Sequence, residues 1–158
     1  MTKKKVTIER TLRAPLADVW ALWTTREGIE SWWGPEGFRV TVRHLDLRPG
    51  GELLYVMEAV GPDQIAFMKR AGMPTAHDAR IVYREVTPTT RLAYLHDVDF
   101  VPEVSAYEVE TVVELRATTD GVHLTLRFDA MHDDTWTARA TEGWNGELGK
   151  LERLLAHR

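Results

Sequence analysis

Histidine next to aspartate is the pattern in this sequence that most directly suggests chemistry, and it occurs twice. His96 precedes Asp97, and His132 precedes two aspartates at positions 133 and 134. Such pairs can form a general base or part of a metal site. Alternation along a strand sends His96 and Asp97 to opposite faces, however, and no other histidine has ligand spacing on the same element. We therefore expect no metal site and assign no catalytic residue.

A serine or cysteine nucleophile and a catalytic role of the aspartates near residue 133 also have weak support. The serines Ser31 and Ser105 both lie outside a Gly-x-Ser-x-Gly motif, and the chain has no cysteine. The absence of cysteine excludes disulfides and thiolate metal ligands, and it fits a reducing compartment. Asp133 and Asp134 have a structural explanation, because carboxylates at the start of a helix cap free N–H groups and favour the helix dipole.

The composition limits the partners. The chain has 158 residues and a net charge of −4, with no basic face, so we expect no nucleic-acid partner. No apolar run approaches the ~20 residues needed to cross a bilayer, and no apolar segment follows the N-terminal lysines. We expect a single domain over residues 1–158, cytoplasmic and without membrane insertion.

Large aromatic residues mark the elements that would position a site. All six tryptophans fall in two stretches with helical spacing, at Trp20, Trp23, Trp32, Trp33, Trp136 and Trp144. Rings concentrated on two helical segments indicate helices that close over a sheet. The buried surface between them would be either a packed core or the wall of a cavity.

Periodicity and turn residues predict the order of the elements. A strand over 4–13 is followed by a helix that Pro15 opens and by a short helix that Thr25 caps and Gly34-Pro35 ends. Further strands are expected at 38–47, 52–58, 79–86, 91–100, 107–118 and 122–131, and a long helix at 135–156. Residues 59–76 predict one extra helix, which is either a lid or a surface helix packed for stability.

Several segments resemble the START-like superfamily. Residues 14–24 (APLADVWALWT) are similar to its AP-x-x-x-V-W-x-x-x-T opening, and residues 32–38 (WWGPEGF) to its WWGP-x-GF segment. Residues 46–51, residues 83–92 and Gly143-Trp144 continue the match in order. The closest resemblance is to the homologues of the activator of the ninety-kilodalton heat-shock-protein ATPase.

This resemblance implies an α+β helix-grip fold. In that fold a curved antiparallel sheet wraps around a long C-terminal helix, with two short helices after the first strand and an elongated cavity between sheet and helix. Members bind lipids, polyketides, hormones or other apolar molecules, a few are cyclases or resistance proteins, and some contact partner proteins. Residues 65–73 depart from the family by extending its usual hairpin, so the resemblance does not decide how the cavity is covered.

The resemblance and the strand alternation together predict a binding site for a small hydrophobic or aromatic molecule, without a cofactor. Rings and methionine side chains would make apolar contacts, while His96 and Tyr55 would orient a carbonyl or hydroxyl. The predicted wall residues are Trp33, Phe38, Tyr55, Met57, His96, Phe100, Met131, Trp136 and Trp144, and the lid candidates are Phe67 and Met68.

Two other functions stay open. A polyketide cyclase-like or hydrolase-like enzyme would use the same cavity, with His96 as general base near Asp99 or Tyr55. A co-chaperone-type interaction module is the third hypothesis, and a homodimer through exposed aromatic surface is not fixed by the sequence. Gly143 and Gly146 lie inside the last predicted helix, where they would let it approach the sheet or bend over the cavity, and packing is the preferred interpretation.

Overall fold

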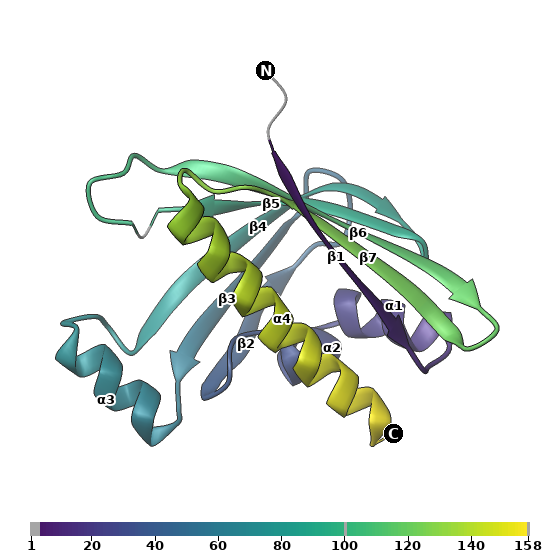
Figure 1. Ribbon diagram of the computed structural model, residues 1–158, viewed down its shortest axis with the longest axis horizontal. Coiled ribbons are helices and arrows are strands. Elements are labelled where there is room, and N and C mark those ends of the chain that lie inside the picture. The colour runs from purple at the N-terminus through teal and green to yellow at the C-terminus, as the bar shows by residue number, and fades with distance from the viewer. Residues whose placement is uncertain (1–3, 100, 158) are drawn as a thin grey trace.

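A curved antiparallel sheet frames the molecule, whose computed structural model describes residues 4–99 and 101–157. The strand order is β1-β7-β6-β5-β4-β3-β2, and neighbouring strands are antiparallel. Figure 1 shows the long helix α4 (Asp134–Ala156) crossing the concave side of this sheet. The α+β helix-grip prediction is confirmed. The strands are β1 (Lys5–Leu12), β2 (Phe38–Leu45), β3 (Glu52–Ala59), β4 (Ala76–Thr87), β5 (Arg91–Val98), β6 (Tyr107–Thr118) and β7 (Gly121–Asp129).

The helices begin where the sequence predicts. α1 (Leu16–Thr24) and α2 (Arg26–Trp32) connect β1 to β2, and α3 (Pro62–Arg70) connects β3 to β4. Thr25 caps α2, because its Oγ1 accepts a hydrogen bond from the Gly28 N–H at 3.0 Å. Asp133 caps α4 in the same way, accepting from the Trp136 N–H at 2.8 Å. The extra helix expected within 59–76 is therefore present as α3.

Some strand ends differ from the predictions because tertiary pairing sets them. β4 begins at Ala76 rather than at 79, since it continues to pair with β3 as far as Glu58. β7 ends at Asp129 rather than at 131, where its pairing with β1 ends opposite Lys5. Phe100, which the sequence places at the end of a strand, lies outside the described residues.

A cluster of tryptophans joins the first two helices to the last one. Trp23 and Trp32 are fully buried and meet edge to face, with ring centroids 4.7 Å apart. The Trp32 indole N–H donates to the Leu22 carbonyl at 2.8 Å. Trp23 also stacks on Trp144 of α4, with centroids 6.1 Å apart. Pairs of this kind contribute about 0.5–1.5 kcal/mol beyond area burial, so the cluster fixes α4 against α1 and α2.

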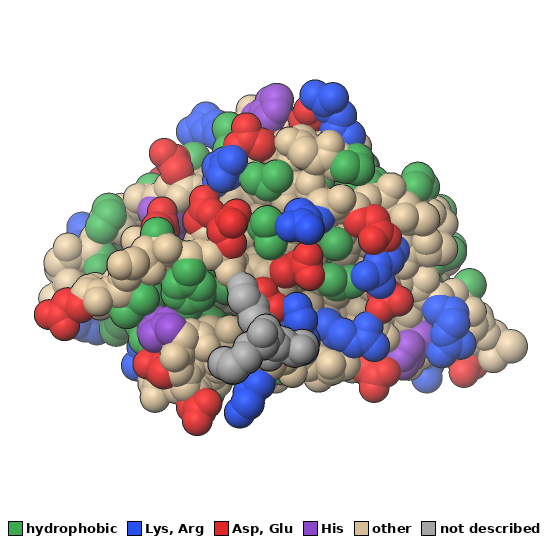
Figure 2. All heavy atoms as spheres, turned by 90° about the horizontal axis from the view of Figure 1, so that it is seen from above, with side chains coloured by type: hydrophobic (Ala, Val, Ile, Leu, Met, Phe, Trp, Pro, Cys, Tyr) green, Lys and Arg blue, Asp and Glu red, His purple; other side chains and the backbone are tan. Residues whose placement is uncertain are grey.

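Charges on the surface are mixed. On the face in Figure 2, basic and acidic side chains are interspersed and no large region of one sign appears. Ion pairs join strands, as between Arg91 Nη1 and Glu114 Oε1 at 3.3 Å. Within the described part of the chain, no helix is both long and apolar enough to cross a membrane.

Candidate ligand-binding site

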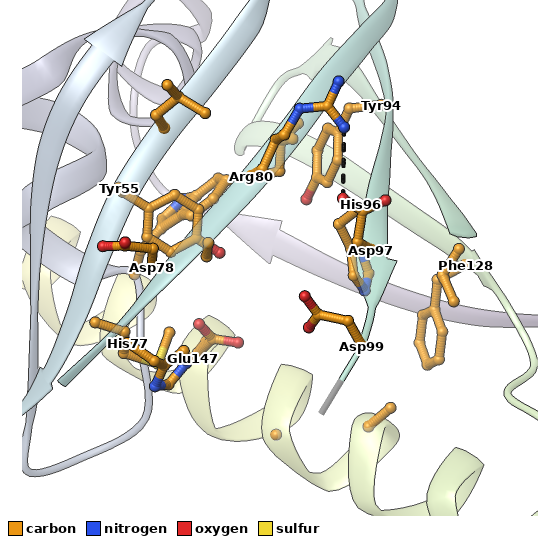
Figure 3. Close-up of a pocket in the computed structure, with 18 of the residues that line it drawn as sticks. Tyr55, His77, Asp78, Arg80, Tyr94, His96, Asp97, Asp99, Phe128 and Glu147 are labelled. Carbon is orange, nitrogen blue, oxygen red and sulfur yellow. Dashed lines mark hydrogen bonds and ion pairs between the residues drawn. The ribbon is translucent and has the colours of Figure 1, made fainter. Parts of the chain in front are cut away.

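A cavity of about 790 Å³ lies between the sheet and α4. Its walls come from strands β2 to β7, from Trp33 at the end of α2, and from one face of α4. Figure 3 shows side chains of the sheet and of α4 directed toward this space. The α4 contribution consists of Ala140, Gly143, Trp144 and Glu147.

The register of the sheet brings the strand residues together. Ile81 on β4 pairs with His96 on β5, and His96 pairs in turn with Val109 on β6. Residues directly opposite one another in antiparallel strands share a face, so these three side chains form a continuous row along the cavity. Pairing thus places the predicted His96 on the cavity wall.

The predicted site residues divide into two groups. Six of them line the cavity, namely Trp33, Tyr55, Met57, His96, Met131 and Trp144. Phe38 and Trp136 are half-buried and lie outside the lining. The lid candidates, both on α3, also lie outside it, with Met68 buried and Phe67 59% exposed. A lid role for α3 therefore stays a prediction, as does any role of Phe100.

Trp136 belongs to a separate polar cluster at the start of α4. Its ring lies 6.0 Å from that of His132, and the Arg139 guanidinium lies 4.9 Å from the Trp136 ring. His132 is itself held by Tyr107, whose hydroxyl oxygen is 2.7 Å from His132 Nδ1. The second histidine-aspartate motif thus packs around the beginning of the helix.

Glu147 is a cavity residue that the sequence prediction missed. Its Oε1 accepts a hydrogen bond from the Gly34 N–H at 2.7 Å, and the Lys150 ammonium donates to the Gly34 carbonyl at 2.8 Å. Burial raises the pKa of the Glu147 carboxyl to about 7, although the Gly34 N–H and the Lys150 charge both act to lower it. The cavity therefore contains an acid that changes charge near neutral pH.

Two tyrosines and a tryptophan surround this end of the cavity. The Trp33 ring meets Tyr55 edge to face at 5.6 Å and lies 6.2 Å from Tyr94. Burial is the main reason that the pKa of each phenol is raised, and the negative charge of Glu147 raises both further. Both phenols are therefore neutral at pH 7 and lie within electrostatic reach of the carboxyl.

His96 is neutral at pH 7 for the same physical reason. Burial lowers the pKa of its imidazole, and the charges of Asp97 and Asp129 only partly oppose this. A neutral imidazole has one donor and one acceptor nitrogen. His96 can thus orient a carbonyl or a hydroxyl group, which is the role predicted for it.

Charged residues of the sheet also border the cavity, and the sequence prediction did not include them. The Arg80 Nη1 atom lies 3.4 Å from Asp97 Oδ2, as Figure 3 marks, and Arg80 also pairs with Glu52. Arg80 lies between the lining residues Ala79 and Ile81 on β4, and Asp97 follows His96 on β5. Arg43 is the extra residue of a β-bulge in β2. The other charged or titratable residues of this border are His77, Asp78 and Asp99.

A curved antiparallel sheet wrapped around a C-terminal helix, with a cavity between them, places the protein in the START-like, helix-grip class. Residues 13–156 match the model of the family described as Activator of Hsp90 ATPase homolog 1-like protein, and the chain belongs to this family.

Solved structures share the fold over nearly the whole chain. A protein from Chromobacterium violaceum is 22% identical, with a TM-score of 0.77 and 96% of each chain covered. An AHSA1-like protein from Aeromonas hydrophila is 23% identical, with a TM-score of 0.76, over 98% of this chain and 93% of that one. A Nitrosomonas europaea protein is 25% identical, with a TM-score of 0.71, over 97% and 94%. No curated protein matches the chain significantly.

Proposed function

We propose that this protein binds a small, mainly apolar molecule in the cavity between the sheet and α4. The observation that carries the proposal is the cavity itself. Its volume of about 790 Å³ falls within the range of roughly 300–1,000 Å³ typical of small-molecule sites. Its wall combines aromatic, aliphatic and methionine side chains, which are usual in such sites, with the charged border described above.

The first test is native mass spectrometry of gently purified protein, followed by extraction and identification of any small molecule. We expect a stoichiometric adduct that disappears when the protein is denatured. Its chemical structure would identify the ligand class, and the same spectrum would report whether the protein is a homodimer.

A second test places binding in the cavity. Ala140 lines the cavity and Ala138 is exposed on the same helix, so Ala140→Trp and Ala138→Trp form a matched pair. We expect the uncharged fluorescent probe N-phenyl-1-naphthylamine to bind the wild type and Ala138→Trp. Binding should be lost in Ala140→Trp, because the indole fills the cavity. Equal binding to both variants would locate the probe elsewhere and contradict the proposal.

An enzyme acting in the same cavity is the second candidate function, and Glu147 is the observation that favours it. A carboxyl with a pKa of about 7 is suited to general acid–base catalysis at neutral pH. The neutral imidazole of His96 lines the same cavity from the sheet side. Molecules extracted from the wild type and from Glu147→Gln distinguish the two functions. An unreacted precursor found only in the variant indicates an enzyme, whereas identical molecules indicate a binding protein.

A further inference from the structure

We propose that the cavity selects ligands that carry an amine cation, held by the Glu147 carboxylate and the faces of the surrounding aromatic rings. This inference rests on the proposed function, since it specifies the chemistry of the ligand that the cavity binds. Three features of the site support it: the acceptor capacity of the carboxylate, the aromatic rings around it and the charges nearby.

The carboxylate has acceptor capacity beyond its contact with the protein. Glu147 borders the cavity, and its Oε1 accepts a hydrogen bond from the Gly34 N–H. An ionised carboxylate offers about four lone-pair sites on its two oxygens. A donor group on a ligand in the cavity can therefore bind the carboxylate while the contact with Gly34 is kept.

The rings around the carboxyl favour a cation among the possible donors. Trp33, Tyr55, Tyr94 and Trp144 all line the cavity. Glu147 bonds to the N–H of Gly34, the residue after Trp33, and the Trp33 ring lies 5.6 Å from Tyr55 and 6.2 Å from Tyr94. Aromatic faces attract ammonium groups through the ring quadrupole, most strongly where water is excluded. A carboxylate beside several such faces is the arrangement expected for an amine cation.

The charges nearby leave the carboxyl without a full counter-charge. Lys150 acts on Glu147 electrostatically, but its ammonium is bonded to the Gly34 carbonyl. His96 is held neutral by burial, Arg80 is paired with Glu52 and Asp97, and His77 is exposed. Burial still dominates the Glu147 carboxyl and keeps its pKa near 7. A ligand cation would supply the missing charge, whereas an anionic ligand would be repelled.

A matched series of probes tests this inference by isothermal titration calorimetry. The probes 2-(2-naphthyl)ethylamine, 2-(2-naphthyl)ethanol and 2-naphthylacetate share one ring system and differ in the charge of the polar group. We expect the wild type to bind the amine roughly tenfold or more tightly than the alcohol, and the acetate most weakly. Glu147→Gln should lose the preference for the amine while still binding the alcohol, because its amide oxygen can accept from the Gly34 N–H. Glu142→Gln, which changes an exposed carboxyl on the same helix, should behave as the wild type.

The pH dependence provides a readout that a purely structural role of Glu147 would not change. Protonation of the carboxyl removes the negative charge, so affinity for the amine should rise between about pH 5.5 and 8 in the wild type. In Glu147→Gln the affinity for the amine should be nearly constant over this range. His77, His96 and Lys150 are present in both proteins, so any effect they have on the affinity is common to both.

The outcomes separate the two proposals. If the wild type binds the amine and the alcohol equally, or if Glu147→Gln keeps the preference, cavity binding stands and the amine inference is wrong. If none of the three probes binds, the proposed function is contradicted as well.

Discussion

A buried carboxyl such as Glu147 makes the free energy of unfolding depend on pH in an unusual direction. Its pKa rises from 4.5 to about 7 on folding, so between these values the folded protein binds more protons than the unfolded chain. The free energy of unfolding therefore falls as pH rises through this range, by an amount on the order of 3 kcal/mol.

We expect Glu147→Gln to remove that fall. Compared with the wild type, the variant should gain stability as the pH increases from 4.5 to 7, because it carries no charge to bury. Urea denaturation at several pH values measures the difference, with Glu142→Gln as the control. Parallel pH profiles for Glu147→Gln and the wild type would show that the pKa of the carboxyl does not change on folding.

His96 should have the opposite effect at acid pH. Burial lowers the pKa of its imidazole below 6.5 in the folded protein. The free energy of unfolding is therefore unaffected by this group above about pH 6.5, and it decreases as the pH falls through the folded-state pKa. We expect His96→Gln, which stays neutral, to lose less stability than the wild type on acidification. Denaturation of His44→Gln, which replaces an exposed histidine on β2, serves as the comparison. An unchanged acid limb in His96→Gln would mean that the imidazole has the same pKa in the folded protein as in the unfolded chain.

At the scale of the elements, Gly143 of α4 is explained by the cavity rather than by packing. A Cβ atom added at Gly143 or at Gly146 would have no neighbouring atom within 4 Å. The expectation that these glycines allow close packing against the sheet is therefore wrong. Gly143 lines the cavity, whereas Gly146 is exposed. The missing side chain at Gly143 enlarges the space available to a ligand.

This difference gives a paired prediction. Gly143→Ala and Gly146→Ala should each raise the free energy of unfolding by about 1 kcal/mol, because alanine favours a helix interior. Only Gly143→Ala should weaken binding of N-phenyl-1-naphthylamine, since only its methyl group enters the cavity. Thermal denaturation and fluorescence titration measure the two effects, and weakened binding in Gly146→Ala would point to a change in the helix rather than in the cavity.

The sequence predicts most elements because their signals are local. Thr25, Asp133 and the turn residues around Gly50 and Gly121 mark helix starts and hairpins without any knowledge of the fold. No residue of α3 lines the cavity. This depends on how the whole β3–β4 hairpin extends from the sheet, which no local sequence pattern encodes.

Glu147 was missed for a different reason, since a carboxyl on a helix usually faces water. Its position nevertheless contained a signal. Glu147 lies three residues after Trp144 and four before Leu151, within the apolar face of α4. A charged residue inside an apolar stripe at helical spacing predicts a buried, functional group. The charged border that includes Arg43 and Arg80 was missed because predicting it requires knowledge of the β2 bulge and of the ion pairs between strands. Neither can be obtained from the sequence alone.

At the scale of the whole molecule, occupation of the cavity should stabilise the fold. A ligand that binds only the folded state adds about 2.7 kcal/mol at a concentration one hundred times its Kd. We expect 2-(2-naphthyl)ethylamine at such an excess to raise the Tm of the wild type and to raise that of Ala140→Trp much less. Differential scanning calorimetry measures both, and equal shifts would indicate binding outside the cavity.

The pairing of β1 with β7 also determines the order in which the molecule can assemble. Lys5 lies opposite Asp129, 124 positions later in the chain, whereas β2 lies at the other edge of the sheet. Pairings of such large sequence separation slow folding, because a long loop must close before they form. During synthesis the hairpins from β2 to β6 can form in turn, while β1 must wait for β7, with which it pairs. The α4 wall of the cavity is synthesised after all seven strands, so a nascent chain cannot capture a ligand there until α4 has been made.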